Sequence, residues 1–255
     1  SGQNGAVVVP PTKGTNGNPG PPLTWINEDP NSSLTFYTGP VDATDNIGVQ
    51  TGSVGGNGGN GGSSTFSPIS GESGGSAGAG GDVQFTNSST IKILSNDNFS
   101  FDVQNGKVGS VGGVGIVAYS IGGRGGRGGN GNLAPVAGSG GSGASGANVV
   151  VNNLADIQTG GINNSIGANS SFGIYAFSGG GQGGGGGDQS GLWGWPGDGA
   201  GTSGGGNVSI CNGYNIAVSG CSATGTSSEA ISPTIQTSGN YSHVLNALSI
   251  GGAGG

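Results

Sequence analysis

Few residues in this chain have the types and spacings that catalysis needs. His243 is the single histidine and precedes an apolar segment, and no Ser-His-Asp spacing stands out because serine is so abundant. Polysaccharide-cleaving sites need clustered carboxylates, usually with calcium or a basic residue beside them. The twelve acidic residues are scattered, and the only adjacent pair, Glu28 and Asp29, fits a solvated turn. We therefore predict no catalytic residues and no enzyme activity.

Metal and cofactor chemistry has equally little support. Two cysteines and one histidine cannot supply a convincing zinc ligand set, and GGGGGD at 183–188 lacks a repeated GGxGxD calcium pattern. We predict no metal and no cofactor. Cys211 and Cys221 flank an Asn-Gly-Tyr-Asn turn. In an oxidising compartment they are expected to form a local disulfide that contributes about 2–3 kcal/mol; two buried thiols are the alternative.

Two tryptophans are the only candidates for contact with a ligand or partner. Trp193 and Trp195 stand in GLWGWPGDG (191–199), at the expected tip of a glycine-rich hairpin. An exposed tryptophan pair can stack on sugar rings or anchor a partner chain. An equally good interpretation is that these rings fold back over the glycine layer as a lid.

The secondary structure that must position these residues can be predicted from a sequence motif that occurs four times. The motif is an apolar segment, followed by a serine and a run of glycines. The copies align on serines separated by 67, 58 and 71 residues, which predicts a stack of similar units. Counting back by two from each serine gives an aliphatic, a small and a serine position on one face of a strand. The predicted structural ladder is Val49, Ile116, Ile174 and Leu245; Thr51, Ala118, Ala176 and Ala247; and Ser53, Ser120, Ser178 and Ser249.

Each of the first three glycine runs ends in a new strand that begins GGDVQF, GANVVV or GGNVSI. In one unit VVVNN (149–153), DIQTG (156–160) and FGIYAFS (172–178) read as three short strands separated by turns. Each unit of three strands ends in the same motif, which predicts that one unit forms one coil of a parallel β-solenoid. We expect an all-β chain of about four coils in one repetitive domain, 1–255. Its repeats are 1–53, 83–120, 149–178 and 208–249, separated by glycine-rich insertions 54–82, 121–148 and 179–207.

The glycine insertions have a period of three, with Asn57 and Asn60, or Arg124, Arg127 and Asn130, at every third position. Three residues per turn is the period of the polyproline-II helix. We expect each insertion to be a hairpin of two extended arms, and successive hairpins to pack as a polyglycine-II-like layer. Flexible loops are the alternative.

Composition limits the possible partners. Sixty-five glycines and eleven prolines approach the level at which disorder is the default, but the apolar residues are concentrated in the strand phrases. A net charge of −7 without a basic patch argues against nucleic acid as a partner. No stretch approaches the length of an apolar membrane-spanning helix, and no secretory signal stands at Ser1.

The segment ANVVVNNLADIQTGGINNSIGANSSFGIYAFSGGGQGGGGG (147–187) resembles the glycine-rich passenger repeats of bacterial autotransporter-type surface proteins. The resemblance extends, with insertions, over roughly 80–255 and more loosely over 1–62, where PPTKGTNGNPGPP (10–22) interrupts it. It implies a right-handed parallel β-helix displayed outside a Gram-negative cell, in adhesion, aggregation or a biofilm matrix. The 255 residues contain neither the C-terminal membrane barrel nor the signal peptide of such proteins, so the resemblance leaves the export route open.

We therefore expect a non-enzymatic extracellular structural or adhesive protein. It would be a rod or filament module that self-associates end to end through β-strand pairing, with a host or matrix glycan as a further partner. The alternative is a glycan- or ice-binding β-solenoid. The chain ends mid-phrase at GGAGG, so more chain or another subunit is expected to follow.

Overall fold

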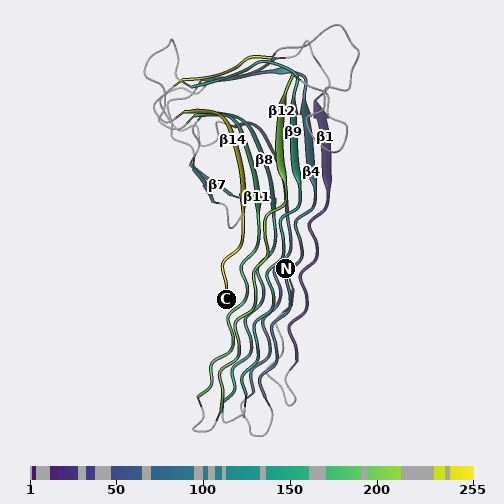
Figure 1. The fold of residues 1–255 in the computed structure, drawn as a ribbon, viewed down its shortest axis with the longest axis vertical. Helices are drawn as coiled ribbons and strands as arrows, with labels where there is room; N and C mark the ends of the chain where they lie inside the picture. The colour runs from purple at the N-terminus through teal and green to yellow at the C-terminus, as the bar shows by residue number, and fades with distance from the viewer. Residues whose placement is uncertain are drawn as a thin grey trace.

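The computed structural model describes most of the chain in thirteen segments. They are 2–3, 12–27, 33–37, 47–64, 70–94, 100–102, 107–110, 113–132, 136–160, 171–190, 194–213, 233–238 and 242–255. Within them the regular structure is all β-strand. Figure 1 shows the strands gathered in a broad upper part, which we call the head, and long wavy traces that run down from it, which we call the shaft.

The head contains three four-stranded parallel sheets, and each sheet takes one strand from each repeat. Sheet 1 has the order β1-β4-β9-β12, sheet 2 the order β2-β5-β10-β13, and sheet 3 the order β3-β8-β11-β14. The strands are β1 Leu23–Asn27, β2 Ser33–Tyr37, β3 Ile47–Val54, β4 Val83–Asn87, β5 Thr90–Leu94, β8 Val114–Ile121, β9 Val149–Asn153, β10 Ile157–Gly160, β11 Phe172–Gly179, β12 Val208–Asn212, β13 Ile235–Thr237 and β14 His243–Ile250. A separate antiparallel pair joins β6 (Ser100–Asp102) to β7 (Lys107–Ser110).

Alternation of apolar and polar residues explains why these segments form strands that face a common core. In β4 the side chains of Val83, Phe85 and Asn87 are buried, while those between them are half-buried, as a period of two requires. The three sheets direct their aliphatic faces at one another, and residues such as Ile91 and Ile174 are fully buried there. This burial of apolar side chains holds the head together.

The prediction of a right-handed parallel β-helix, or β-solenoid, of about four coils is wrong. The described strands form three separate parallel sheets, and no described strand continues one sheet into the next to close a coil. The physical reason lies in the glycine-rich stretches 55–82, 122–148 and 180–207, where the chain leaves sheet 3 before it reaches sheet 1. Glycine has no side chain to pack in a sheet and loses the most backbone entropy on ordering, so the sheets stop where the glycine begins. The fold is all-β with three parallel sheets, and the β6–β7 pair was not predicted.

The shaft is built from the glycine-rich stretches, which run out from the head and back as extended arms (Figure 1). The outgoing arms are 55–64, 122–132, 180–190 and 251–255, and the returning arms are 12–22, 70–82, 136–148 and 194–207. Arms of one kind bond to one another at every third residue. Gly58 N–H donates to the carbonyl of Arg124 at 2.9 Å, and Gly125 N–H donates to that of Gln182 at 2.9 Å. The backbone N–H and C=O groups of each arm are therefore hydrogen-bonded to neighbouring arms, as those of a strand are in a sheet.

A second set of hydrogen bonds joins outgoing arms to returning arms. The N–H of Gly126 donates to the carbonyl of Gly75 at 2.9 Å, and the N–H of Gly184 donates to that of Gly141 at 2.9 Å. The arms lie too close for side chains here, because a Cβ placed on Gly184 would overlap the carbonyl oxygen of Gly126. Glycine is needed at such positions so that backbone can approach backbone.

Candidate functional site

The structure brings the predicted ladder residues of sheet 3 side by side. The pairs Val49–Ile116, Ile116–Ile174 and Ile174–Leu245 are in register, as are the corresponding small residues and serines. The rows formed by Thr51, Ala118, Ala176 and Ala247, and by Ser53, Ser120, Ser178 and Ser249, follow in order along the same strands. Their side chains are buried in β3, β8 and β11, but Leu245 in β14 is 44% exposed. The ladder is thus part of the core, and it is open at its C-terminal end.

The serine row connects the head to the shaft. The hydroxyl of Ser120 donates to the carbonyl of Gly81 at 2.8 Å and accepts the N–H of Ala147 at 2.9 Å. Ser178 does the same one repeat later, with Ala147 O at 2.7 Å and Gly206 N–H at 2.7 Å. Each of these buried hydroxyls bridges two successive returning arms. Because each of these two hydroxyls both donates and accepts a hydrogen bond, Ser120 and Ser178 have a structural role at the junction of head and shaft.

Sequence reasoning missed a row of buried asparagines at the end of sheet 1. The side-chain nitrogen of Asn87 donates to Asn153 Oδ1 at 2.8 Å, and that of Asn153 donates to Asn212 Oδ1 at 2.7 Å. Asn87 and Asn153 are fully buried, so these bonds satisfy amides that would otherwise be costly. The signal was present, since VQFTN, VVVNN and VSICN each place asparagine fifth.

His243 begins β14 and contacts an aromatic side chain of the neighbouring strand β11. Its ring stacks on Phe172, with centroids 5.4 Å apart and planes at 21°, and Phe172 meets Tyr175 edge to face at 5.6 Å. Burial raises the pKa of Tyr175 above its usual value of 10.0. Among the described residues, no three histidine, cysteine or acidic side chains come together as a metal site. This corner of the head is an aromatic cluster on the outer face of sheet 3.

The two cysteines are only partly described. Cys211 is buried at the end of β12 and is disulfide-bonded. Cys221 lies outside the described residues, so its pairing with Cys211 stays a prediction. A disulfide at this position is consistent with folding in an oxidising compartment.

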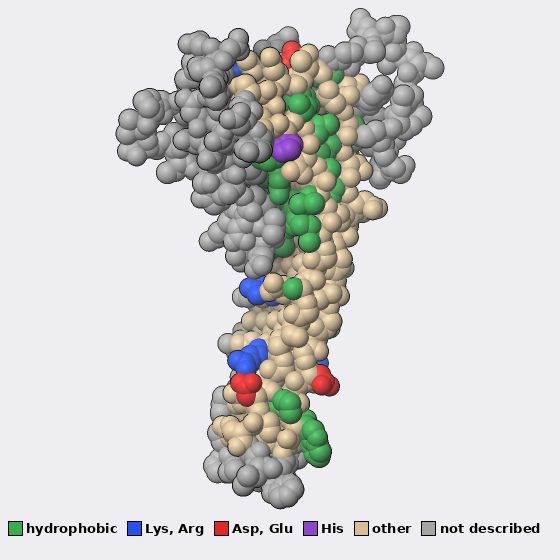
Figure 2. All heavy atoms as spheres, turned by 60° about the vertical axis from the view of Figure 1, so that its left-hand side comes forward, with side chains coloured by type: hydrophobic (Ala, Val, Ile, Leu, Met, Phe, Trp, Pro, Cys, Tyr) green, Lys and Arg blue, Asp and Glu red, His purple; other side chains and the backbone are tan. Residues whose placement is uncertain are grey.

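At the far end of the shaft, Trp195 is 71% exposed and Val136 is 41% exposed. They face each other across an isolated parallel bridge, and Ala137 N–H donates to the carbonyl of Trp195 at 3.1 Å. Trp193, the other member of the predicted tryptophan pair, lies outside the described residues. Hydrophobic side chains are visible at the narrow end of the molecule in Figure 2. The exposure of Trp195 is compatible with the predicted contact role, which stays a prediction.

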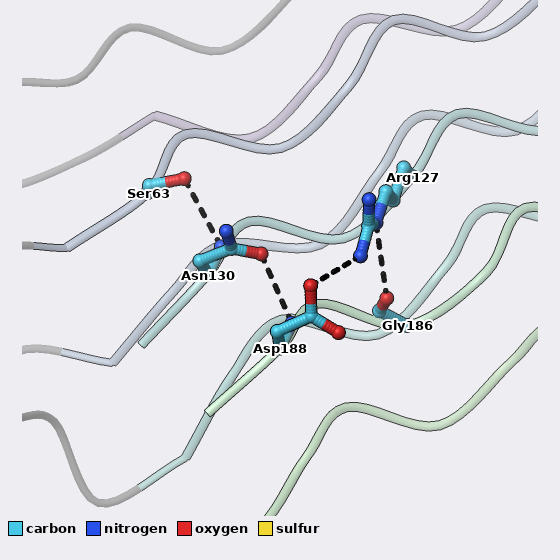
Figure 3. A network of polar contacts seen from close by, with 5 residues as sticks. All are labelled: Ser63, Arg127, Asn130, Gly186 and Asp188. Carbon is cyan, nitrogen blue, oxygen red and sulfur yellow. Dashed lines mark hydrogen bonds and ion pairs between the residues drawn. The ribbon is translucent and has the colours of Figure 1, made fainter. Parts of the chain in front are cut away.

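The face of the shaft formed by outgoing arms carries long polar side chains that brace neighbouring arms (Figure 3). Arg127 forms an ion pair with Asp188 at 2.6 Å and donates from Nε to the carbonyl of Gly186 at 3.4 Å. Asn130 Oδ1 accepts the N–H of Asp188 at 3.0 Å, and Ser63 Oγ accepts the N–H of Asn130 at 3.0 Å. These polar groups bond to one another between neighbouring arms, which favours a role in holding the arms together over ligand binding.

The opposite face, formed by returning arms, carries small side chains. Hydrogen bonds align residues 13, 73, 139 and 198 as one row, because Gly14, Gly74 and Gly140 donate to the carbonyls of residues 73, 139 and 198. The residues of this row are Lys13, Ser73, Ser139 and Asp198, and the next rows begin at Asn16 and Pro19. Charged residues therefore stand only at the two ends of this row.

A cavity of about 160 Å³ lies where the outgoing arms leave sheet 3. Ile121, Gly179 and Ile250 are in register, and the glycine leaves a gap between the two isoleucines that Phe177 only partly fills. Arg124 stands at the rim and its guanidinium is hydrogen-bonded to Gln182. The recess is suited to an apolar side chain and offers no acid–base pair.

Comparison with known proteins adds no relative: a scan against protein-family models and searches of curated proteins and solved structures gave no match. The part of the chain that the structure describes contains no apolar helix of membrane-spanning length.

Proposed function

We propose that this protein is a non-enzymatic, extracellular structural or adhesive protein that forms rods or filaments by self-association. The observation that carries the proposal is the state of the last strand of sheet 3. Val244, Leu245 and Ile250 in β14 are 39–44% exposed, whereas Ile116 and Ile174, which are in register with Leu245, are fully buried. At the C-terminal end of the stack, the last layer therefore exposes apolar side chains of the kind that are buried in the inner layers.

Each of the three sheets has one edge strand at either end of the stack. The edge strands are β12, β13 and β14 at one end of the stack and β1, β2 and β3 at the other. An exposed edge strand such as β14 is a template on which a strand of another chain can pair, and strand addition is a common mode of protein association. The disulfide-bonded Cys211 supports an extracellular setting. Adhesion to cells or to a biofilm matrix fits a rod of this kind.

The test is electron microscopy and sedimentation velocity of the 255-residue protein over a dilution series. We expect rods or filaments whose length grows with protein concentration. The variant Leu245→Lys, which places a charge on the exposed end, should shorten them, because edge lysines oppose strand pairing. Ser142→Lys, on the exposed face of a returning arm, is the matched control and should leave assembly unchanged. Single particles at every concentration would contradict the proposal and favour a glycan- or ice-binding role.

A further inference from the structure

The hydrogen bonds between returning arms all run in one direction. Gly14 N–H donates to the carbonyl of residue 73 at 3.2 Å, Gly74 N–H to that of residue 139 at 2.9 Å, and Gly140 N–H to that of residue 198 at 2.9 Å. The outgoing arms follow the same rule, as the bond from Gly58 to the carbonyl of Arg124 shows. Among arms of one kind, each arm thus donates towards the C-terminal end of the stack and accepts from the N-terminal end.

This direction makes the two ends of the shaft chemically different. The last returning arm, 194–207, presents the N–H groups of Gly199, Thr202 and Gly205, for which the described residues provide no acceptor. The first returning arm, 12–22, presents carbonyls that stand one position earlier in the repeat than those donors, and they accept no bond from any described residue. These are Lys13, Asn16 and Pro19, and the proline contributes a carbonyl but no N–H. One end is a row of donors and the other a row of acceptors at the same three-residue spacing.

The charged residues also differ between the two ends of the shaft. Lys13 and Asp198 are exposed and occupy opposite ends of a single row, with only serines between them. If a second copy continues the row, its Lys13 becomes the neighbour of Asp198. Arms bonded through N–H and C=O groups lie about 5 Å apart, which is within reach of an ion pair between these side chains.

We infer that the partner of the C-terminal end is the N-terminal end of a second copy, so that assembly is head to tail and has a polarity. The contact joins the donors of arm 194–207 to the acceptors of arm 12–22 and sets Asp198 beside Lys13 of the next copy. This inference rests on the proposed self-assembly and specifies its geometry. Continuation of the arm pattern places residues 254 and 255 where residues 2 and 3 of the next copy lie, so one of these short segments moves aside.

A symmetric dimer does not satisfy the same groups. Two C-terminal ends would face donors with donors and Asp198 with Asp198, and two N-terminal ends would face carbonyls with carbonyls. A head-to-tail contact leaves a free end of each kind after every addition, so it produces an open filament.

A charge-exchange experiment tests the direction. Lys13→Asp and Asp198→Lys each place like charges at every joint, so each variant alone should assemble roughly five-fold more weakly than the unmodified protein, the size of an exposed charge pair. Mixed in equal amounts, the two variants present opposite charges at every joint between unlike copies, and assembly should recover. The double variant should recover alone. The differences should shrink in 1 M salt.

Thr202 supplies an independent test of the donor row. Thr202→Pro removes one unpaired N–H and puts a ring carbon in its place, and an extended arm accommodates proline. Assembly should weaken about ten-fold, because the carbonyl of Asn16 in the next copy loses its donor. Thr202→Ala keeps the N–H and should assemble normally, and both variants should keep the far-ultraviolet circular dichroism of the unmodified protein.

The outcomes separate this inference from the proposed function. If the unmodified protein does not assemble at any concentration, the proposed function is wrong. If it assembles but the mixture fails to recover, or Thr202→Pro assembles as well as Thr202→Ala, the head-to-tail contact is overturned while self-assembly stands.

Discussion

The head and the shaft are made from the same repeats but are held together by different forces. In the head, side chains such as Phe85 and Ile174 are fully buried between the sheets, and the hydrophobic effect stabilises the stack. In the shaft, the inner positions are glycines, and neighbouring arms are joined by backbone hydrogen bonds from both sides. The comparison shows that a high glycine content is compatible with order where each arm finds partners for its backbone groups.

The difference predicts opposite responses to mutation. The head should tolerate a substitution that keeps apolar volume and suffer from one that removes it. The shaft should tolerate changes on its outer faces and suffer from any side chain added at an inner glycine. The following substitutions test this contrast, beginning with the largest expected effect.

Removal of apolar volume from the head should have the largest effect. Ile174→Ala empties part of a fully buried site and should lower the free energy of unfolding by about 3–4 kcal/mol. Leu245→Ala acts at the position in register with it, but that side chain is 44% exposed, so the loss should be about 1 kcal/mol or less. Urea denaturation of monomeric protein measures both. Equal losses would show that Leu245 is as deeply buried as Ile174 within the single molecule, and that this end of the stack is closed.

Addition of a side chain to the shaft should have the next largest effect. A Cβ on Gly184 overlaps the carbonyl of Gly126, whereas a Cβ on the adjacent Gly185 meets nothing within 4 Å. Gly184→Ser should therefore destabilise by about 2 kcal/mol and Gly185→Ser by less than about 0.5 kcal/mol. The pair is well matched, because both substitutions change the unfolded chain in the same way.

Hydrogen exchange locates the damage. Gly184→Ser should speed exchange of amides in arms 122–132 and 136–148 while the core strands of the head keep their protection. If the two glycine variants behave alike, the arms are not packed backbone against backbone, and the contrast between head and shaft fails.

The contrast also explains which features could be predicted from the sequence. Strands with clear alternation were placed correctly, since the predicted VVVNN segment is β9 and the predicted FGIYAFS segment lies within β11. Alternation reports which side of a strand is buried, and that is a local property. Whether one sheet continues into the next depends on how the glycine-rich stretches pair, which no apolar pattern reports, and the predicted β-helix failed there.

The candidate site was predictable to a similar degree. The serine positions were evident from the repeat, but their hydrogen bonds to residues such as Gly81 and Ala147 depend on where the returning arms lie. The asparagine row was overlooked because asparagine is common in turns, although its fifth position in three strands was informative. The polarity of the ends cannot be seen in the sequence at all, because it resides in the direction of backbone bonds.

The junction of head and shaft should show an intermediate effect. Ser178→Ala removes a buried hydroxyl that serves Ala147 and Gly206 at 2.7 Å each, leaving two backbone groups without a partner. We expect a loss of about 1.5 kcal/mol. Ser249→Ala changes the exposed member of the same row and should cost less than about 0.5 kcal/mol. A comparable loss for Ser249→Ala would mean that its hydroxyl already bridges to a further arm.

The smallest effect should come from the outer face of the shaft. Arg127 and Asp188 form an ion pair whose side chains are 54% and 75% exposed, so water and salt screen their attraction. Arg127→Ala should destabilise by about 0.5 kcal/mol at low salt, and a double-mutant cycle with Asp188→Asn should assign most of this to the pair. In 1 M salt the coupling should vanish, since the backbone bonds beneath it carry the shaft. A coupling above about 2 kcal/mol that persisted in salt would show that side chains, and not glycine backbone, hold the arms together, and the distinction between the two regions would be lost.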